Sequence, residues 1–311
     1  MFNIHQIPLD GDPSNRQQTF EKMHIDILCC RYWWLRAWQS QLMSFPYWRL
    51  YWNRTEGAYV VYKKKIRLTP GSIVLIPPHT SFSTGIEGKQ TAREVPYALQ
   101  GGWVEDAAME ELAVQRGDIL HLFIHFRLGF PFDSVEAGIY EIQASSENQR
   151  LIQNIICQLI DGAYSFDPSQ SLQVYSLILS AAGFLPADIW KDQMIDRRIL
   201  KGIDLMEQNI HKTRIESQDL ASLAGMANNS YIRLFREQTG YSPKKYLQRM
   251  RVEQACTLLH HSGLSIKEIA ALCGFSDRYY FTKIFTRVMK MSPGAYRRNS
   301  LAPSPKGFQL R

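Results

Sequence analysis

An internal repeat in the last third of the chain constrains the fold most. Residues 220–226 read LASLAGM and residues 269–275 read IAALCGF, at an offset of 49. Beyond these runs the offset is 50, where 231–235 corresponds to 281–285 and Ser242-Pro243 to Ser292-Pro293. One added residue in the second copy accounts for the change. Such self-similarity indicates that the same supersecondary unit occurs twice.

Each copy has the order helix, turn, helix. Gly225 and Gly274 lie where a tight turn needs a permissive backbone. Ser217 is a suitable N-cap for the first unit, and residues 265–268 (SIKE) form a capping box for the second. The sequence therefore predicts two helix-turn-helix units.

The second helix of each unit needs one buried face and one exposed face to read DNA. Aromatic and aliphatic residues at i, i+3 and i+4 form the buried face: Tyr231, Leu234 and Phe235 in the first unit, and Phe281, Ile284 and Phe285 in the second. The predicted DNA-contacting residues are Asn229, Ile232, Arg233 and Arg236, followed by Arg278, Tyr279, Thr282, Lys283 and Thr286. Arg and Lys suit guanine edges, Asn suits adenine, and Ile or Thr carbon suits the thymine methyl group. Phosphate contacts or plain surface charge are the alternatives for each residue.

The charge distribution agrees with a polyanionic partner. Residues 195–311 hold 20 Lys and Arg against 9 Asp and Glu, whereas residues 1–194 hold 16 against 20. Such asymmetry is typical of a chain whose basic part meets nucleic acid, although a solvated basic face would give the same count.

A single helix is expected between the two units. Ser242-Pro243 begins it and Gly263 ends it, which gives about 18 residues and a rod of roughly 27 Å. Successive major-groove faces are ~34 Å apart, so one monomer could set its two units into neighbouring grooves.

The same segment resembles the AraC family of regulators. The resemblance rests on the run from Arg251 to Ala255, on residues 273–275 and 292–293, and on matches at Leu259, Ile266, Ile269, Ala270, Phe281, Phe285 and Tyr296. It covers about residues 197–299 and implies a seven-helix DNA-binding domain with two helix-turn-helix units. In that family the second unit often contacts mainly the DNA backbone. Tyr279-Tyr280 is bulkier than usual there, so base readout by the second unit stays open.

The first half of the chain reads as short strands with turns, at residues 48–52, 58–62, 66–68, 73–76, 120–128 and 138–142. Residues 70–78 resemble a segment of the cupin-like sensor barrels often attached to AraC readers. Helices are expected near 106–114, at 148–161 and at 168–182, and the rest of 77–118 is unassigned. The expected fold is an α+β multidomain chain: a cupin-like barrel with helices over 1–184, a linker over 185–194, an all-α DNA-binding domain over 195–300, and a tail over 301–311.

A small-molecule effector is expected in the barrel. Six of the seven tryptophans precede residue 104, and aromatic rings suit stacking against a carbohydrate. The candidate effector-binding residues are Trp48, Trp52, His79, His121 and His125. The segment before the barrel, up to about Phe20, is the expected lid, and residues 183–194 are the expected connector. The alternative is that the aromatic residues are plain core.

The sequence offers two rival functions. His79, His121 and His125 could form the metal site of a cupin enzyme, but the histidine motif lacks a following Glu. No nucleophile triad, phosphate-binding glycine loop or carboxylate pair is found. A ligand-independent architectural DNA-binding protein would not need the first domain. We therefore expect a non-enzyme with no cofactor and no catalytic metal.

Location and assembly follow from simpler features. Neither an export leader nor an apolar run of about 18 residues is found, so a cytoplasmic protein is expected. The five cysteines lack a CxxC pair and are expected to be buried thiols. A homodimer is expected through an apolar stripe at residues 151–160, whose alternative is burial against its own barrel. RNA polymerase is a further expected partner.

Overall fold

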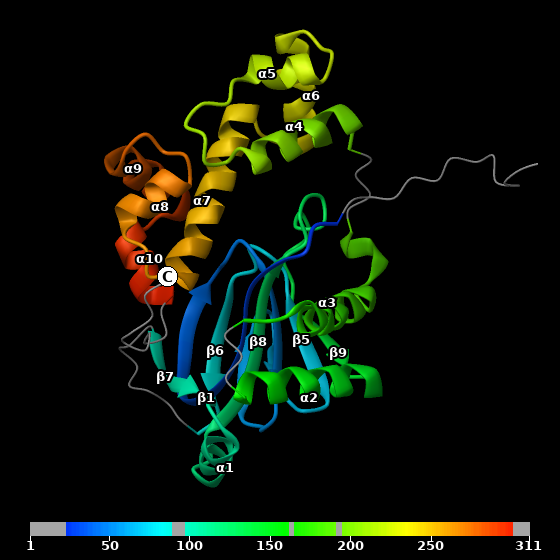
Figure 1. The fold of residues 1–311 in the computed structure, drawn as a ribbon, viewed down its shortest axis with the longest axis vertical. Coiled ribbons are helices and arrows are strands. Elements are labelled where there is room, and N and C mark those ends of the chain that lie inside the picture. Colours follow the sequence, from blue (N-terminus) through cyan, green and yellow to red (C-terminus); the bar gives the residue numbers. More distant parts are fainter. Residues whose placement is uncertain (1–22, 89–96, 162–164, 191–194, 301–311) are drawn as a thin grey trace, which may run out of the picture.

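The computed structural model describes residues 23–88, 97–161, 165–190 and 195–300. Figure 1 shows a β-rich N-terminal part and an all-helical C-terminal part that lies against one end of it. The α+β two-part fold predicted from the sequence is confirmed. The expected lid before Phe20, residues 191–194 of the expected connector and the tail from residue 301 lie outside the described residues.

Nine strands of the described residues form one antiparallel sheet that curves into a nearly closed barrel. The strands are β1 Asp26–Met43, β2 Trp48–Asn53, β3 Ala58–Val61, β4 Lys65–Arg67, β5 Ser72–Ile76, β6 Phe82–Ile86, β7 Tyr97–Trp103, β8 Ile119–Arg127 and β9 Tyr140–Gln143. Their order is β4-β3-β6-β1-β8-β2-β5-β9, and β7 also pairs with β1. The first half of β1 pairs with β8, and its second half pairs with β7 and β6.

Alternation along the strands separates two hydrophobic cores. Trp48, Leu50 and Trp52 of β2 belong to the core between the sheet and its helices, whereas Tyr47 and Tyr51 belong to the core inside the barrel. Successive side chains of a strand point to opposite faces, so one strand serves both cores.

Three helices and a short 3-10 turn accompany the barrel in the described residues: α1 Ala107–Gln115, α2 Ser146–Ile160, α3 Pro168–Gly183 and the turn Ala187–Ile189. Ser145 caps α2 by accepting a bond from the Asn148 amide at 3.1 Å. Asp167 and Gln170 form a reciprocal capping box at the start of α3, with Pro168 in the first turn. These caps set where the two helices begin: α3 begins at the predicted Pro168, whereas α2 begins two residues before the predicted residue 148.

The apolar stripe of α2 is buried within the chain itself. Leu151, Ile152, Ile155, Ile156 and Leu159 belong to the core between the sheet, α2 and α3, and each is at most 7% exposed. The expectation that this stripe forms a dimer was therefore wrong, because its hydrophobic area is already covered by the barrel and α3. The alternative, burial against the chain's own barrel, is confirmed.

The C-terminal part is made of seven helices in the described residues. They are α4 Arg197–Gln208, α5 Ser217–Leu223, α6 Asn228–Thr239, α7 Pro243–His261, α8 Ile266–Leu272, α9 Arg278–Met289 and α10 Pro293–Ser300. The predicted linking helix is α7, whose 19 residues span about 28 Å. Ser242 is its N-cap residue and Pro243 lies in its first turn, as predicted.

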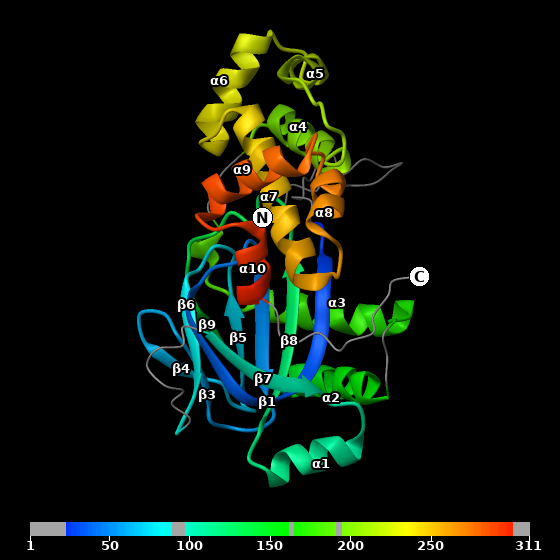
Figure 2. The ribbon, with the colours of Figure 1, turned by 90° about the vertical axis from the view of Figure 1, so that its left-hand side faces the viewer.

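The second half of α7 packs onto the open end of the barrel. Val252, Ala255 and Leu259 are fully buried in one cluster that also holds Phe45 and Tyr47 of the barrel. Figure 2 shows α7, α8 and α10 next to the barrel, whereas α5 and α6 lie at the far end of the molecule. The two parts of the chain therefore share one hydrophobic core. No helix of the described residues has the length and hydropathy that a membrane crossing requires.

Three strands were not predicted from the sequence. The 18-residue β1 was not predicted, and β6 and β7 lie in the unassigned segment 77–118. β1 pairs on both edges and curves around the barrel, so its burial follows no simple alternation. β7 carries the Gly101-Gly102 pair, where a Cβ on Gly101 would lie 2.4 Å from the Trp34 carbonyl oxygen. Glycine is needed there for packing, although it lowers strand propensity.

The two turn glycines of the repeat should respond differently to substitution. Gly225 has φ +63° with open space around an added Cβ, whereas at Gly274, with φ +70°, that Cβ would lie 2.4 Å from the backbone oxygen of Ile210. Gly225→Ala should lower the free energy of unfolding by about 1–2 kcal/mol through backbone strain alone. Gly274→Ala should lower it by ~3–5 kcal/mol because backbone must also move.

Urea unfolding of the two variants, followed by circular dichroism, measures both values. Gly225→Ala is the matched control for strain without a clash. Equal losses in the two variants would contradict the clash at Gly274.

Candidate nucleic-acid interface

The two repeat copies fold into the same helix-turn-helix geometry. Gly225 and Gly274 both adopt the left-handed conformation. The amide of Met226 donates to the Ala221 carbonyl at 2.9 Å, and the amide of Phe275 donates to the Ala270 carbonyl at 3.0 Å. These bonds close the first helix of each unit in the same way.

The packing behind the two second helices is equivalent as well. Tyr246 meets the Phe235 ring edge-on at 5.3 Å, and Tyr296 meets the Phe285 ring edge-on at 5.6 Å. The capping differs: Ser265 caps α8 as predicted, but Glu216, not Ser217, is the N-cap residue of α5. Glu216 forms a capping box with Asp219, and Ser217 is the first residue inside the helix.

The outer face of α6 holds the residues predicted to contact DNA in the first unit. Tyr231 and Phe235 are fully buried, while Asn229, Arg233 and Arg236 are exposed and Ile232 is half-buried. The side chain of Arg233 is 80% exposed, and Glu237 is 3.9 Å away. A weak ion pair of this kind leaves the guanidinium available to another partner.

The outer face of α9 holds the corresponding residues of the second unit. Phe281, Ile284 and Phe285 are buried, and Tyr279 is 87% exposed. A shallow hollow on this face is lined by Arg278, Tyr279, Thr282, Lys283, Thr286 and Arg287. Arg287 was missed by the sequence analysis, although its position four residues after Lys283 on the helix places it on the same face.

The structure divides the five predicted effector-binding residues among three places. Trp48 and Trp52 point toward α2 and α3, since Trp48 pairs with Phe126 and Trp52 with Leu122 in the register of β2 and β8. Trp48 also stacks on Phe126, and its indole nitrogen donates to Asp133 at 2.9 Å. The grouping of these tryptophans with the histidines was therefore wrong, because the strand period puts them on opposite faces of the sheet.

His121 and His125 face the interior of the barrel. His125 lies opposite Arg49 and His121 lies opposite Asn53 in the same register. The Nδ1 atom of His121 is 2.7 Å from the Asn53 side-chain oxygen. Burial, with a smaller effect of the Arg49 charge, lowers the pKa of His121 to about 3. Burial also lowers the pKa of His125. Both imidazoles are therefore neutral at physiological pH.

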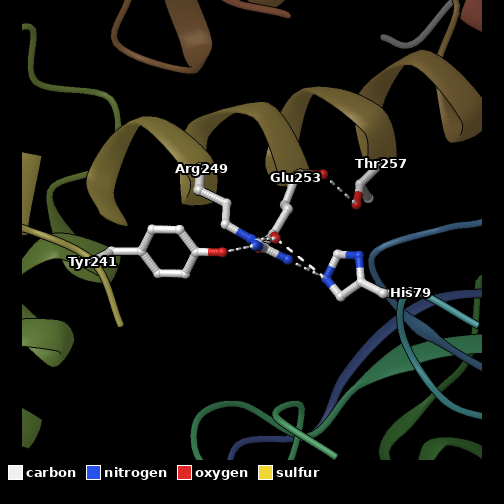
Figure 3. A network of polar contacts seen from close by, with 5 residues as sticks. All are labelled: His79, Tyr241, Arg249, Glu253 and Thr257. Carbon is white, nitrogen blue, oxygen red and sulfur yellow. Dashed lines mark hydrogen bonds and ion pairs between the residues drawn. The ribbon is translucent and has the colours of Figure 1, made fainter. Parts of the chain in front are cut away.

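His79 lies outside the barrel interior, in the contact between the two parts of the chain (Figure 3). Its Nε2 atom is 3.3 Å from a Glu253 carboxylate oxygen and 3.3 Å from an Arg249 nitrogen. Arg249 also donates to Glu253 at 2.9 Å and to the Tyr241 hydroxyl at 2.6 Å. The carboxylate of Glu253 keeps a pKa below its ordinary value because His79 and Arg249 offset its burial. His79 thus links the barrel to α7.

A buried arginine is the charged centre of the barrel interior. Arg49 is 5% exposed and donates to the hydroxyls of Tyr51 at 2.7 Å and Tyr47 at 3.3 Å. Its guanidinium carbon lies 3.4 Å from the centre of the Phe45 ring. Among the described side chains, the Nε atom of Arg49 is one of the buried donors that lack a hydrogen-bond partner. A buried charge whose partners are neutral hydroxyls and whose Nε donor is unsatisfied is costly, which marks this position as suited to an anionic group.

The family model that matches this chain is described as a helix-turn-helix domain and covers residues 220–299. The chain is 44% identical over 80 residues to the transcriptional activator RhaR of Cronobacter sakazakii, which is 26% of this chain and 28% of that protein. The chain spans less than half the length of the first curated relatives that it matches.

Solved structures give likenesses over the C-terminal part and over most of the chain. The DNA-binding domain of AdpA, solved with a target DNA, is 32% identical, with 35% of this chain and 98% of that chain covered and a TM-score of 0.33. ToxT of Vibrio cholerae is 12% identical, with 91% of this chain and all of that chain covered and a TM-score of 0.45.

Two helix-turn-helix units joined by a long helix define the class of the C-terminal part. It is a double helix-turn-helix domain of the kind found in transcription regulators. More particularly, the family model described as a helix-turn-helix domain matches residues 220–299, the segment in which the sequence resembles the AraC family.

The depressed pKa of His121 predicts a pH dependence of stability. The unfolded chain binds a proton on this histidine below about pH 6.5, whereas the folded chain does so only near pH 3. The free energy of unfolding should therefore fall by about 1.4 kcal/mol per pH unit from this residue as pH drops from about 6 to about 4.

Urea unfolding across this pH range compares the parent chain with His121→Gln, which should show a shallower slope by that amount. His211→Gln, at an exposed histidine, is the matched control and should keep the parent slope. An unchanged slope in a folded His121→Gln variant would contradict the depressed pKa.

Proposed function

We propose that this chain is a transcription regulator that binds a specific DNA site through α6 and α9. The observation that carries the proposal is the presence of two equivalent helix-turn-helix units whose outward faces are both basic and exposed. The excess of Lys and Arg over Asp and Glu in residues 195–311 supports a phosphate-rich partner.

The two units differ in the chemistry that they offer to DNA. The face of α6 offers Asn229, Arg233 and Arg236 beside the half-buried Ile232, a set that can pair with base edges and touch a thymine methyl group. The face of α9 offers Arg278, Lys283 and Arg287 beside Tyr279 and two threonines. Three cations around bulky tyrosines fit phosphate contacts, so we assign base readout to α6 and backbone contacts mainly to α9.

Arg233→Ala should weaken binding to the specific site by about 1–3 kcal/mol and relax base preference, because a bidentate contact to a base edge is lost. Lys283→Ala should weaken binding to all sequences and reduce the salt slope by about one. Selection of binding sites from a random DNA pool, followed by titration at several salt concentrations, measures both effects.

Arg150→Ala is the matched control, since Arg150 is an exposed arginine on α2, far from both helices in the chain. It should leave affinity unchanged. If folded Arg233→Ala keeps the parent affinity and preference, α6 does not read bases through this side chain.

We further propose that a small molecule carrying an anionic group binds inside the barrel and regulates DNA binding. The proposal rests on Arg49, whose buried charge faces the phenol groups of Tyr47 and Tyr51 and the imidazole of His125. These groups replace Trp48 and Trp52 as the candidate effector site. A carboxylate here would gain a charge-assisted hydrogen bond from the guanidinium. A sugar acid would satisfy both this charge and the aromatic lining, whereas a neutral sugar would leave the charge unpaired.

Tryptophan fluorescence, followed with a panel of carboxylates and matched neutral compounds, tests the effector. Trp38 lies 4.8 Å from His121 between ring centres, so it should report occupancy. Arg49→Met should lower the affinity for any carboxylate that binds by about 10–150-fold, because a hydrogen bond to a charged group is lost. Arg67→Met, at an exposed arginine of β4, is the control. Equal responses to acids and to neutral compounds would contradict the role of Arg49.

We also propose a homodimer, with RNA polymerase as a later partner on the promoter. Since the α2 stripe is used internally, the exposed Leu172 and Leu179 of α3 are the candidate contact. They lie seven residues apart on one side of the helix and are 62% and 47% exposed. A two-fold arrangement of this face would give one particle with two DNA-binding domains.

A further inference from the structure

Three side chains that bind transition metals meet where the barrel touches α7. They are Cys29 of β1, His125 of β8 and His261, the last residue of α7. One ligand atom of each lies within 4.8 Å of the others. The group combines two residues of the barrel with one residue of the DNA-binding domain. The sequence suggested a different set, His79, His121 and His125, and these three residues do not lie together in the fold.

The backbone positions the three ligands. Cys29 and His125 lie directly opposite each other in the pairing of β1 and β8, next to a bulge between Ile27 and Cys29. His261 is held in the last turn of α7 by the packing of that helix on the barrel. The Nδ1 atom of His125 is 3.4 Å from the Nε2 atom of His261. Two imidazole nitrogens on one tetrahedral Zn²⁺ ion lie ~3.3 Å apart, given Zn–N bonds of about 2.0–2.1 Å.

Two features of the surroundings act on a cation bound here in opposite directions. The C-terminal end of α7 carries the negative end of the helix dipole, which favours a cation. The positive charges of Arg31 and Arg49 act on Cys29 and His261 as well and oppose a cation, and the negative charge of a Cys29 thiolate would offset part of that repulsion. A bound ion would displace the thiol proton to solvent.

His261 also has an unexplained polar atom. Among the described residues, its Nδ1 is a buried nitrogen without a hydrogen-bond partner. The neighbouring His260 points to a different partner, since its Nδ1 is 3.1 Å from the Tyr47 hydroxyl. The other ring nitrogen of His261, Nε2, faces Nδ1 of His125, so two nitrogens that can hold an ion lie at the same point.

We propose that Cys29, His125 and His261 bind a borderline divalent metal ion such as Zn²⁺, and that the ion fastens α7 to the barrel. One thiolate and two imidazoles are a set that zinc accepts, with a water molecule in the fourth position. Because the ligands come from both parts of the chain, binding stabilises the docked arrangement over any arrangement in which they separate. The metal would then act as a second regulatory ligand, at a site that shares His125 with the proposed effector site around Arg49.

The first experiment measures binding in the full chain without DNA. Chelator-treated protein is titrated with Zn²⁺ by calorimetry, and we expect one ion per chain. Cys29→Ser and His261→Gln should each weaken binding by more than the ~10–100-fold that loss of an outer partner costs. Circular dichroism checks that the variants are folded.

Adjacent residues supply matched controls. Cys30→Ser removes a thiol that packs on the opposite face of β1, with the helix-side core, and His260→Gln removes the neighbouring imidazole. Both should keep the parent affinity. Absence of binding, equal affinity in the Cys29 and Cys30 variants, or a loss in His260→Gln without one in His261→Gln would overturn the assignment.

The second experiment tests whether the ion stabilises the contact between α7 and the barrel. Zn²⁺ should slow amide hydrogen exchange in β1, β8 and the second half of α7 of the parent chain, and should leave exchange in Cys29→Ser unchanged. Tight binding without slower exchange in α7 would refute the fastening while keeping the site. Because neither readout uses DNA or the effector, failure here is distinct from failure of the proposed function.

Discussion

The burial of α7 is the interaction on which the rest of the structure depends. Toward its N-terminus, Leu247 belongs to the core of the first helix-turn-helix unit. Toward its C-terminus, Val252, Ala255 and Leu259 are fully buried in the core that includes the second unit and the barrel interior. Arg251 also donates to the backbone carbonyls of Ile210 and Lys212, in the loop between α4 and α5. One helix therefore sets the positions of three bodies relative to one another.

This use of α7 leaves the predicted reader surfaces free. The docked contact employs α7, α10 and the open end of the barrel, as in the contact of Phe45 with Tyr296 at 6.2 Å between ring centres. The outward faces of α6 and α9 are exposed in the same arrangement. Docking of α7 on the barrel thus sets the position of the two helix-turn-helix units relative to the barrel. A ligand at this contact would change that position without covering the outward faces of α6 and α9.

The contact is also unusually rich in polar groups for a hydrophobic core. Arg49, Tyr47 and the imidazoles of His125, His260 and His261 lie together between the barrel and the last turn of α7. His125 and His261 have ring centres 5.3 Å apart, and Tyr47 lies 5.1 Å from His125. Polar groups in a low-dielectric setting respond strongly to charge, so an anion at Arg49 or a cation among the histidines would each alter the same contact.

Much of the C-terminal domain follows from local sequence. Gly225 and Gly274 require the left-handed conformation, Ser242-Pro243 begins α7, and the spacing of Phe281, Ile284 and Phe285 fixes which side of α9 is buried. These features depend on a few neighbouring residues, so periodicity and capping are enough to predict them. Once the buried face of each helix is known, the residues on its other side are predicted to be exposed, as they are in α6 and α9.

The barrel and its sites were decided by tertiary structure. The sequence cannot give the register of β2 against β8, and that register separates Trp48 and Trp52 from His121 and His125. It cannot give the pairing of β1 with β8, which sets Cys29 beside His125, or the docking of α7, which adds His261 from 136 residues further along the chain. Local preference determined the repeated helices. Contacts between distant segments, which depend on strand pairing and shared burial, determined which side chains meet at the two sites proposed for the barrel.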